Sequence, residues 1–271
     1  LDSSSISETI SRALTYASGE FVTVIGDDDF IHPDVLRYLS CAACDDTDIV
    51  IHTPAQYWWP DIVFVENRRN LKPSSLVFAK EYSAEISEIS SEKERVRFFD
   101  NGSMYIGRLP RLYHGFVRRV VLNELVDFFG DMVVGSSPDI SLALQLSYIR
   151  EKYIHIDFPL TIYGACYNSG GGMTARKEHF GDIEKMSFLP DNVQENWDIN
   201  LPKVWTERVI YAQTAYEVSE KIGKPCRTNV FQTYIGLLVN EYKLNSIFIP
   251  FFIERVGIVQ TVVIVTRSFL K

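Results

Sequence analysis

The hydrophobic pattern of the first fifty residues alternates between helical and strand period, and it constrains the fold more than any other feature. Residues 5–17 carry apolar side chains at helical spacing behind a Ser-x-x-Glu capping box. A short β-rich run covers residues 21–25, a helix is expected over residues 33–44, and another strand over residues 48–53. This order predicts an α/β fold with a mostly parallel open sheet flanked by helices.

The pattern continues with helices and strands up to a glycine triplet. Helices are expected over about 120–129 and 138–148, and residues 154–163 are typical of a last strand, broken at Pro159. Residues 81–97 are rich in Glu, Ser and Lys and indicate either a surface helix or a mobile loop. Gly170, Gly171 and Gly172 are interpreted as a flexible loop.

Beyond the glycines the pattern is helical. One helix is expected around residues 205–223, ended by Gly223 and Pro225, and a second over about 229–242. We therefore predict two parts: an α/β domain over residues 1–169 and a mainly helical C-terminal region over residues 170–271.

Composition argues against one broad class of ligand. The chain of 271 residues has a formal net charge of −8 and a pI near 5.2, so a broad nucleic-acid footprint is not expected. Binding of an anionic small molecule would need a local source of positive charge, such as a metal ion or a helix N-terminus. Cys41 and Cys44 have zinc-like spacing, but they fall in an apolar helical pattern without a second pair nearby. We interpret them as packing residues in a reducing compartment.

Three consecutive aspartates, Asp27, Asp28 and Asp29, directly follow the hydrophobic run at 21–25. Like charges at this spacing repel, and a carboxylate cluster at a strand end favours a compensating cation. Oxygen ligands suit Mg²⁺ or Mn²⁺, and ligands bind at the carboxyl ends of strands in open α/β sheets. The alternative is a solvated turn that helps to cap the next helix.

Residues 17–29, Ala-Ser-Gly-Glu-Phe-Val-Thr-Val-Ile-Gly-Asp-Asp-Asp, with Pro33 four residues on, resemble the central segment of family-2 glycosyltransferases of the GT-A fold. The resemblance implies that Asp28 is the principal ligand of a divalent ion bridging the donor's diphosphate, with Asp29 and Asp27 supporting it. Many relatives carry an aspartate where Gly26 stands, which leaves the assignment within the triplet open. The family's nucleotide-base-binding unit would precede this segment, so we expect it to be missing here.

A second motif lies at residues 136–140, Ser-Ser-Pro-Asp-Ile, which open a helix after Gly135. The family usually places a Glu-Asp pair at this helix start, and its Asp is the general base of inverting members. The resemblance therefore implies that Asp139 is the catalytic base, with Pro138 in place of the Glu. The alternative is that Asp139 only complements the positive end of its helix. The resemblance covers roughly residues 5–165.

Other candidate residues have weaker signals. In the family, the segment before the catalytic helix lines the acceptor and donor-sugar site, so His114 and Arg118 are candidates for substrate contact. Trp58 is a candidate for stacking on a sugar ring, although core or interface packing is the favoured reading of the aromatic run at 57–59. The glycine triplet at 170–172 would either approach phosphate with its amides or act as a plain linker.

The apolar tail bears on location. Residues 247–265 are strongly apolar, but Glu254 and Arg255 would lie near the middle of a membrane span. Arg there costs about 2.5–3.5 kcal/mol on insertion scales, which argues against a span. Core burial is favoured, and an interfacial helix or a dimer contact is the alternative. We expect a cytoplasmic protein, at the inner face of the membrane if the tail contacts lipid.

The favoured function is a metal-dependent inverting glycosyltransferase. It would transfer a sugar from a nucleotide-sugar donor to a hydroxyl of a glycan or lipid-linked acceptor, in surface polysaccharide biosynthesis by family analogy. The second hypothesis is a non-catalytic, truncated relative that binds a sugar or a partner protein. A metal-dependent phosphoryl or nucleotidyl transferase would need a second carboxylate set, for which the sequence offers no obvious candidate.

Overall fold

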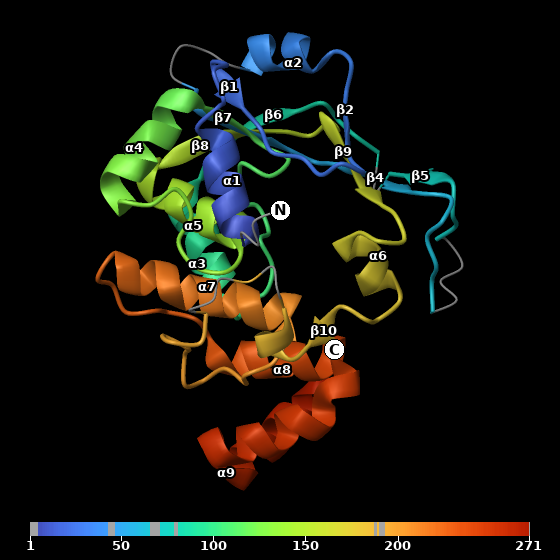
Figure 1. Cartoon of the computed structure of the whole chain (residues 1–271), viewed down its shortest axis with the longest axis vertical. Helices are drawn as coiled ribbons and strands as arrows, with labels where there is room; N and C mark the ends of the chain where they lie inside the picture. Colours follow the sequence, from blue (N-terminus) through green and yellow to red (C-terminus); the bar gives the residue numbers. More distant parts are fainter. Residues whose placement is uncertain are drawn as a thin grey trace.

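The computed structural model describes residues 5–42, 47–65, 71–78, 81–186, 189 and 193–270. These residues form a mixed α/β structure. In Figure 1 most strands lie in the upper part of the molecule with helices packed around them, and the C-terminal helices lie below. The helices are α1 (Ile6–Leu14), α2 (Val35–Ala42), α3 (Ser91–Asp100), α4 (Arg119–Phe129), α5 (Pro138–Ile149), α6 (Gly170–Ala175), α7 (Glu207–Lys221), α8 (Val230–Asn240) and α9 (Asn245–Ser268), with 3₁₀ turns at Ile183–Lys185 and Tyr242–Leu244. The strands are β1 (Phe21–Val22), β2 (Phe30–Ile31), β3 (Ile49–His52), β4 (Ala55–Trp58), β5 (Ser75–Val77), β6 (Ile86–Ser90), β7 (Phe116–Arg118), β8 (Lys152–Ile156), β9 (Thr161–Ala165), β10 (Phe180–Gly181) and β11 (Trp205–Thr206).

The strands form two larger sheets and one short ribbon. One sheet has the order β1-β7-β3-β8-β6, the other β2-β9-β4-β5, and β10 pairs with β11. Only β3 with β8 and β4 with β9 pair in parallel among the described strands of the two larger sheets. The α/β class is confirmed, whereas the expectation of a mostly parallel sheet is wrong.

The antiparallel insertion of β7 has a local cause. Val24 donates to the Leu112 carbonyl and accepts from the His114 N–H, so residues 112–114 run parallel to the chain after β1. His114 then adopts a left-handed backbone with φ of 55°, and the chain reverses. As a result β7 runs antiparallel to both β1 and β3. A left-handed non-glycine residue is uncommon and has to be held by its surroundings.

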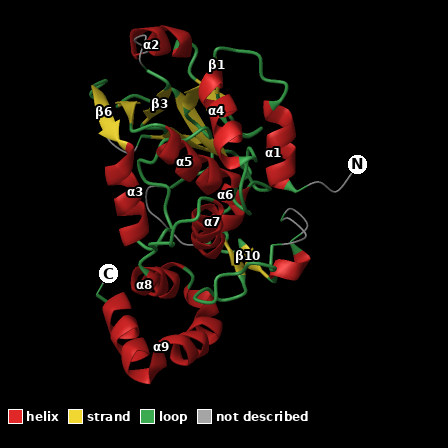
Figure 2. Cartoon of the chain, turned by 90° about the vertical axis from the view of Figure 1, so that its left-hand side faces the viewer, coloured by secondary structure: helices red, strands yellow, loops and turns green. Residues whose placement is uncertain are grey.

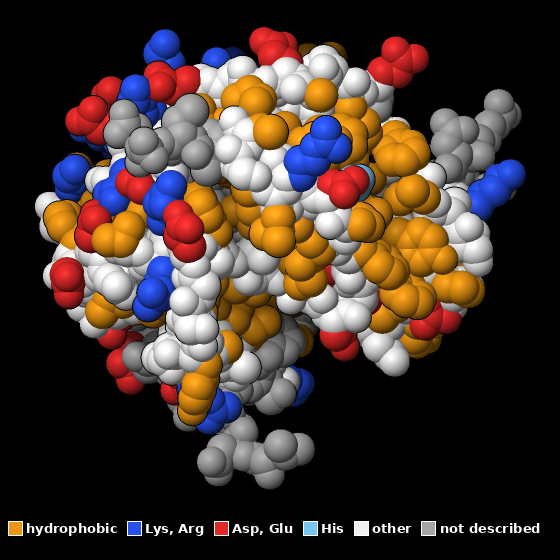
Figure 3. All heavy atoms as spheres, turned by 90° about the horizontal axis from the view of Figure 1, so that it is seen from above, with side chains coloured by type: hydrophobic (Ala, Val, Ile, Leu, Met, Phe, Trp, Pro, Cys, Tyr) orange, Lys and Arg blue, Asp and Glu red, His pale blue; other side chains and the backbone are white. Residues whose placement is uncertain are grey.

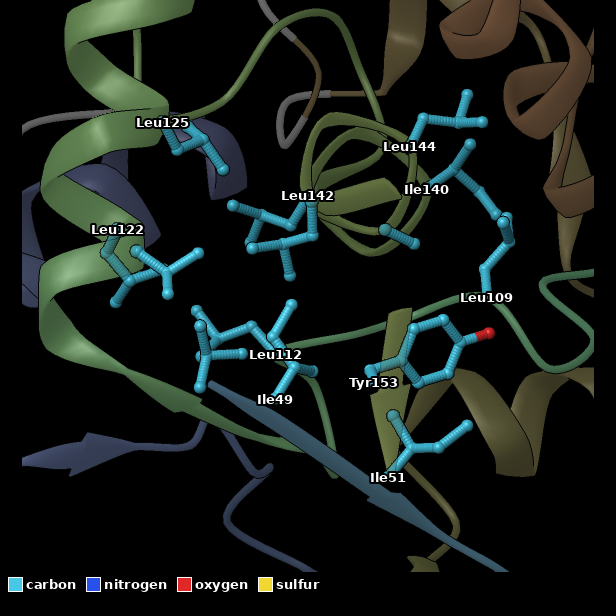
Figure 4. Close-up of a cluster of buried hydrophobic side chains, with 14 of the residues drawn as sticks. Ile49, Ile51, Leu109, Leu112, Leu122, Leu125, Ile140, Leu142, Leu144 and Tyr153 are labelled. Atoms are coloured by element: carbon cyan, nitrogen blue, oxygen red, sulfur yellow. The ribbon is translucent and has the colours of Figure 1, made fainter. Parts of the chain in front are cut away.

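The main core lies between the five-stranded sheet and its covering helices. All four residues of β3 are buried, because the strand is central and both of its faces are covered. Ile49 and Ile51 join the cluster that α4 and α5 fill, with Leu122 and Leu142 among its members (Figure 4). Val50 points to the opposite face and packs in a smaller cluster with residues of α2. The strand's two-residue period thus decides which side chain enters which cluster.

The apolar core continues past residue 170. Ala215 and Val218 of α7 belong to the same cluster as α4 and α5. A second cluster joins α8 to α9 and includes Tyr234, Phe248 and Phe252. The division into domains at residues 169 and 170 stays a prediction, and the core is continuous across that point.

Most expected elements are confirmed, including the capping box of α1 and the helices α4, α5, α7 and α8. Two readings are wrong. Residues 81–97 are neither one helix nor a loop: Ile86–Ser90 forms β6, whose full length pairs with β8, before α3 begins. The glycine triplet is not a flexible loop, since it forms the first turn of α6, capped by the Ser169 side chain. A Cβ on Gly172 would lie 1.9 Å from the Cys166 carbonyl oxygen, so close approach explains this glycine.

The tail forms α9, which bends where Gly257 has a φ of 82° (Figure 2). By length and composition Tyr242–Ser268 qualifies as a membrane-crossing helix, the one such segment in the described part of the chain, with 22% of its most apolar window buried. Phe248, Phe252 and Ile264 of α9 are fully buried, but most of the apolar window is exposed, so the expectation of core burial holds for these three residues and is wrong for the tail as a whole. Cys41 is exposed on α2, and Cys44 lies outside the described residues.

The surface on the α2 side is divided by residue type. Charged side chains of both signs gather toward α4, and apolar side chains gather toward β4 and β5 (Figure 3). The exposed apolar residues of the four-stranded sheet include Phe30 of β2 and Leu76 of β5. Aromatic rings also concentrate at this sheet, where Phe30 stacks on Trp59 with centroids 5.6 Å apart.

Candidate active site

A cavity of about 900 Å³ brings together most of the predicted site residues. Asp28 and Asp29 reach it from the loop after β1, and Asp139 reaches it from the first turn of α5. His114 and Trp58 also line it. The volume lies within the range of about 300–1,000 Å³ found for small-molecule sites. The two motifs, more than a hundred residues apart in sequence, therefore face one space.

Two predicted residues lie elsewhere. Asp27 is exposed, and it is not among the residues that line this cavity. Arg118 ends β7, where its guanidinium pairs with Glu20 and lies 3.8 Å from Asp48. The same group lies over the Phe21 ring, 4.8 Å from its centroid. Arg118 thus has a structural environment of its own, outside the cavity.

Asp29 is held by the protein on both carboxylate oxygens. Oδ1 accepts from the Gly164 N–H at 2.7 Å, and Oδ2 accepts from the Gly26 N–H at 2.6 Å. The Nε2 atom of His114 lies 2.9 Å from Oδ2, and the Tyr113 hydroxyl donates to it at 3.3 Å. Burial acts to raise the pKa of Asp29, but these partners together hold it below its ordinary value. Asp29 is therefore an ionised residue that fixes the loop.

A buried chain of polar groups leads to Asp29 from the neighbouring strand. The Leu160 N–H donates to Nδ1 of His52, whose Nε2 lies 3.0 Å from the Thr161 hydroxyl. That hydroxyl lies 2.6 Å from Nδ1 of His114. Burial lowers the pKa of His52 to about 3 and also lowers the pKa of His114, so both rings are neutral at pH 7. Because the first donor is a backbone amide, the protons are ordered along the chain, and His114 presents its Nε2–H to Asp29.

Asp28 is held more loosely. Its Oδ2 accepts from the Cys166 N–H at 3.2 Å, while Oδ1 has no hydrogen-bond partner among the described residues. Its backbone is fixed instead, since the carbonyl accepts from the Trp59 indole at 2.9 Å. A Cβ on Gly164 would lie 1.6 Å from that carbonyl oxygen, so only glycine allows β9 to approach the loop. Asp28 thus presents a carboxylate oxygen from a rigid backbone.

This arrangement fits a divalent ion in one specific way. No group of three or more His, Cys, Asp or Glu side chains that would hold a metal occurs in the described part of the chain. Mg²⁺ is commonly bound by only one or two carboxylates together with substrate phosphates and water. Asp28 has the open oxygen for this role, and both oxygens of Asp29 are occupied by protein donors. Of the two, Asp28 is therefore the residue that could hold a divalent ion, and Asp29 fixes the loop that carries it.

Asp139 has the opposite electrostatic environment. Burial raises its pKa to about 6, the nearby Glu207 carboxylate adds to the shift, and Arg111 opposes it. Pro138 occupies the first position of α5, where its missing N–H is not needed. A carboxylate with a pKa raised toward neutrality is suited to act as a general base.

The segment before Asp139 is anchored by α7. The Ser136 N–H donates to Glu217 at 3.3 Å, and the Ser137 N–H donates to the Thr214 hydroxyl at 3.0 Å. Burial raises the pKa of Glu217 to about 7. The helical C-terminal region therefore positions the start of α5.

Sequence reasoning missed several residues of the cavity. Glu207 begins α7 and resembles an ordinary acid of a first helical turn. Only the fold shows that its charge raises the pKa of Asp139. Tyr113 donates to Asp29, and Arg111 lines the cavity three residues before His114. In the segment before α5 the family resemblance indicates His114 and Arg118, whereas Arg111 and Tyr113 carry no sequence signal of their own.

The aromatic run at residues 57–59 serves two purposes. Tyr57 and Trp59 pack with Phe30. Because Tyr57 and Trp59 are half-buried and Phe30 is exposed, this packing lies at the surface of the four-stranded sheet, and the expectation of core burial is wrong for these rings. Trp58 packs edge-on to Phe64 with centroids 5.1 Å apart and also lines the cavity. Its indole N–H is buried without a hydrogen-bond partner among the described residues, so it is available to a ligand.

Comparison with known proteins adds no assignment: no family model matches the chain, and no curated protein sequence matches it.

Proposed function

We propose that this protein is a metal-dependent inverting glycosyltransferase with a GT-A-like fold. It would transfer a sugar from a nucleotide-sugar donor to a hydroxyl of a glycan or lipid-linked acceptor. The observation that carries the proposal is that Asp28 and Asp139 line the same cavity of about 900 Å³. One of them has an open oxygen for a cation, and the other has a pKa raised to about 6.

The reaction that suits these groups is a single displacement. Asp139 takes the proton from the acceptor hydroxyl as its oxygen attacks the anomeric carbon. The bond between that carbon and the diphosphate oxygen breaks, and its electron pair leaves with the nucleoside diphosphate. Attack from the side opposite the leaving group inverts the anomeric configuration. Glu207 and Arg111 line the same space, and their charges act in opposite directions on the pKa of the base.

Asp28 would hold Mg²⁺ or Mn²⁺ together with the donor's diphosphate, and the ion would supply Lewis-acid stabilisation of the departing group. Asp29 does not need to bind the ion to matter. Its hydrogen bonds to Gly26 and Gly164 fix the loop from which Asp28 projects. Preorganised positioning of this kind reduces the reorganisation needed during the reaction.

The biological setting follows from the same family analogy. Surface polysaccharide assembly on the cytoplasmic side of a membrane would supply a nucleotide-sugar donor and a glycan or lipid-linked acceptor. Exposed apolar residues on α9, including Ile258, Val259 and Val262, support peripheral membrane contact or self-association through the tail.

Calorimetric titration with UDP, GDP and a panel of their sugars, each with and without Mn²⁺, tests the donor site. We expect metal-dependent binding by the wild-type chain that Asp28→Ala abolishes. Asp27→Ala is the matched control, since Asp27 lies in the same triplet but outside the cavity, and binding should persist.

Two outcomes would contradict the donor site. Equal loss in Asp27→Ala and Asp28→Ala would mean that general acidity, and not the cavity, governs binding. Absence of binding by this chain and by a chain extended with an upstream nucleotide-binding segment would favour a non-catalytic module that binds a sugar or a protein.

A further inference from the structure

Arg111 is a buried cation that forms no ion pair with any residue in the described part of the chain. Its residue is 9% exposed, and no Asp or Glu of the described residues lies within ion-pairing distance of its guanidinium. With described residues it makes a single, long hydrogen bond, from Nη2 to the His52 carbonyl at 3.5 Å, and its Nε–H finds no partner among them. Buried charges are normally paired, because leaving one unpaired is strongly unfavourable. The unpaired guanidinium therefore points to a ligand that supplies the negative charge.

Arg111 forms part of the wall of two cavities. One is the cavity of about 900 Å³ described above, and the other has a volume of about 520 Å³. The second cavity lies where β3 and β8, which run parallel, reach their carboxyl ends: Thr53 follows β3 and Asp157 follows β8. Small ligands bind preferentially at such an edge of an α/β sheet.

The charges decide which cavity suits an anion. The larger cavity contains four acids, Asp28, Asp29, Asp139 and Glu207, which would repel a second anion beside the donor. The smaller one adds a second arginine, Arg108, to Arg111.

The acids of the smaller cavity would repel a bound anion less than those of the larger cavity. Asp157 accepts from the Thr53 hydroxyl on one oxygen and from the Ser83 N–H and hydroxyl on the other. Glu85 is exposed to solvent. Ser87 adds a hydroxyl to the wall. Two guanidinium groups with a nearby hydroxyl form a set of donors that suits a phosphate oxygen.

We propose that the smaller cavity is an anion site in which Arg111, assisted by Arg108, binds a phosphate group, either as the free ion or on a small molecule. The site is distinct from the proposed donor site and does not depend on a metal ion. Since Arg111 also faces the larger cavity, an anion bound to it would reduce the positive charge that acts on Asp139. Occupancy of the smaller cavity would then affect the carboxylate proposed as base.

The test uses inorganic phosphate and glycerol 3-phosphate, titrated into the whole chain with EDTA present. Binding is measured by calorimetry and by the ring nitrogen resonances of His52 and His179. We expect the His52 signals to move, because its carbonyl contacts Arg111, and those of His179 to stay, because it lies only at the larger cavity and another pocket. Tighter binding of the ester would identify a phosphorylated small molecule, and equal binding would identify the free ion.

Three variants locate the site. Arg111→Met should weaken phosphate binding at least about tenfold, as expected for one charge-assisted contact. It should also fold well, because it removes an unpaired buried charge. Ser87→Leu should block the smaller cavity, whereas Arg118→Met, a paired arginine outside both cavities, should bind as the wild type does. Absence of phosphate binding by the wild type, or equal binding by Arg111→Met, would overturn the proposal.

Discussion

The loop after β1 and the start of α5 face the same cavity, yet the protein treats their carboxylates in opposite ways. Asp29 receives backbone amides and a histidine ring, which keep its pKa below the ordinary value. Asp139 is half-buried, and desolvation of its carboxylate together with the nearby Glu207 raises its pKa to about 6. Hydrogen-bond donors therefore keep Asp29 ionised and fixed in place. Asp139 has few such donors, so it accepts a proton more easily.

The largest expected effect is on turnover. Asp139→Asn should reduce the release of nucleoside diphosphate from a bound donor by about 10²–10⁴-fold, the usual contribution of a positioned general base. Donor affinity should change little, because Asp28 is intact. Steady-state kinetics on a donor identified by calorimetry measures both. Retained turnover in Asp139→Asn would remove Asp139 from the mechanism.

Close packing against the aspartate loop provides the next test. Gly164→Ala would place a Cβ 1.6 Å from the Asp28 carbonyl oxygen, so β9 or the loop has to move. Overpacking of this kind destabilises by about 1–3 kcal/mol, and metal-dependent donor binding should be lost with it. Gly170→Ala is the control, because its nearest contact is an ordinary 3.4 Å to the His179 ring. Chemical denaturation of both variants checks the difference, and similar behaviour would contradict the packing account.

The two carboxylates should also respond oppositely when neutralised. Asp29→Asn leaves buried donors facing an amide NH₂ and should lower the free energy of unfolding at pH 7 by about 1–3 kcal/mol. Asp139→Asn should raise it, by on the order of 2–3 kcal/mol, since the ionised form is disfavoured in the folded state. Urea unfolding at pH 7 decides the signs. The same sign for both would refute the contrast.

The opposite pKa shifts of Asp29 and Asp139 predict opposite contributions to the pH dependence of stability. Asp29 has a lowered folded pKa, so its contribution is present above the ordinary value near 4 and is lost as pH falls through the folded value. Asp139 has a raised pKa, so its contribution declines as pH rises from about 4 to about 6 and is constant above. Unfolding measured across pH 3–8 should lose the first component in Asp29→Asn and the second in Asp139→Asn.

The smallest expected effect concerns Glu207. Glu207→Gln removes a negative charge near Asp139 and should lower the pKa of Asp139, shifting the acidic limb of the rate profile to lower pH by less than about one unit. Glu220→Gln, on the same helix but away from the cavity lining, is the control. An unchanged limb in Glu207→Gln would show that the charge of Glu207 does not contribute to the pKa of Asp139.

The sequence predicts much of this fold because its helices have clear periods and caps. The capping box of α1 and the proline that opens α5 are local signals, and both elements form where expected. The antiparallel course of β7 depends on the left-handed backbone of His114, which no local signal announces. The helix at residues 170–175 was not predicted because glycine disfavours helices. Here Gly172 is required because a side chain at this position would collide with the Cys166 carbonyl.

The candidate site was predictable only in part, for a similar reason. Asp28 and Asp139 stand in recognisable motifs, so the sequence indicates them. The separate roles of Asp28 and Asp29 depend on amides of β9, which lie far away in sequence. The influence of Glu207 on Asp139 depends on α7 packing beside α5, a tertiary arrangement that adjacent residues do not encode.

The most direct test of the central contrast is a carboxyl ¹³C NMR titration of protein labelled at aspartate, with Asp29→Asn and Asp139→Asn used to assign the two signals. The account predicts that Asp139 titrates near pH 6 and that Asp29 stays ionised to below the ordinary aspartate value. If both signals titrate together near pH 4, the cavity does not distinguish the two carboxylates, and the assignment of Asp139 as base loses its physical basis.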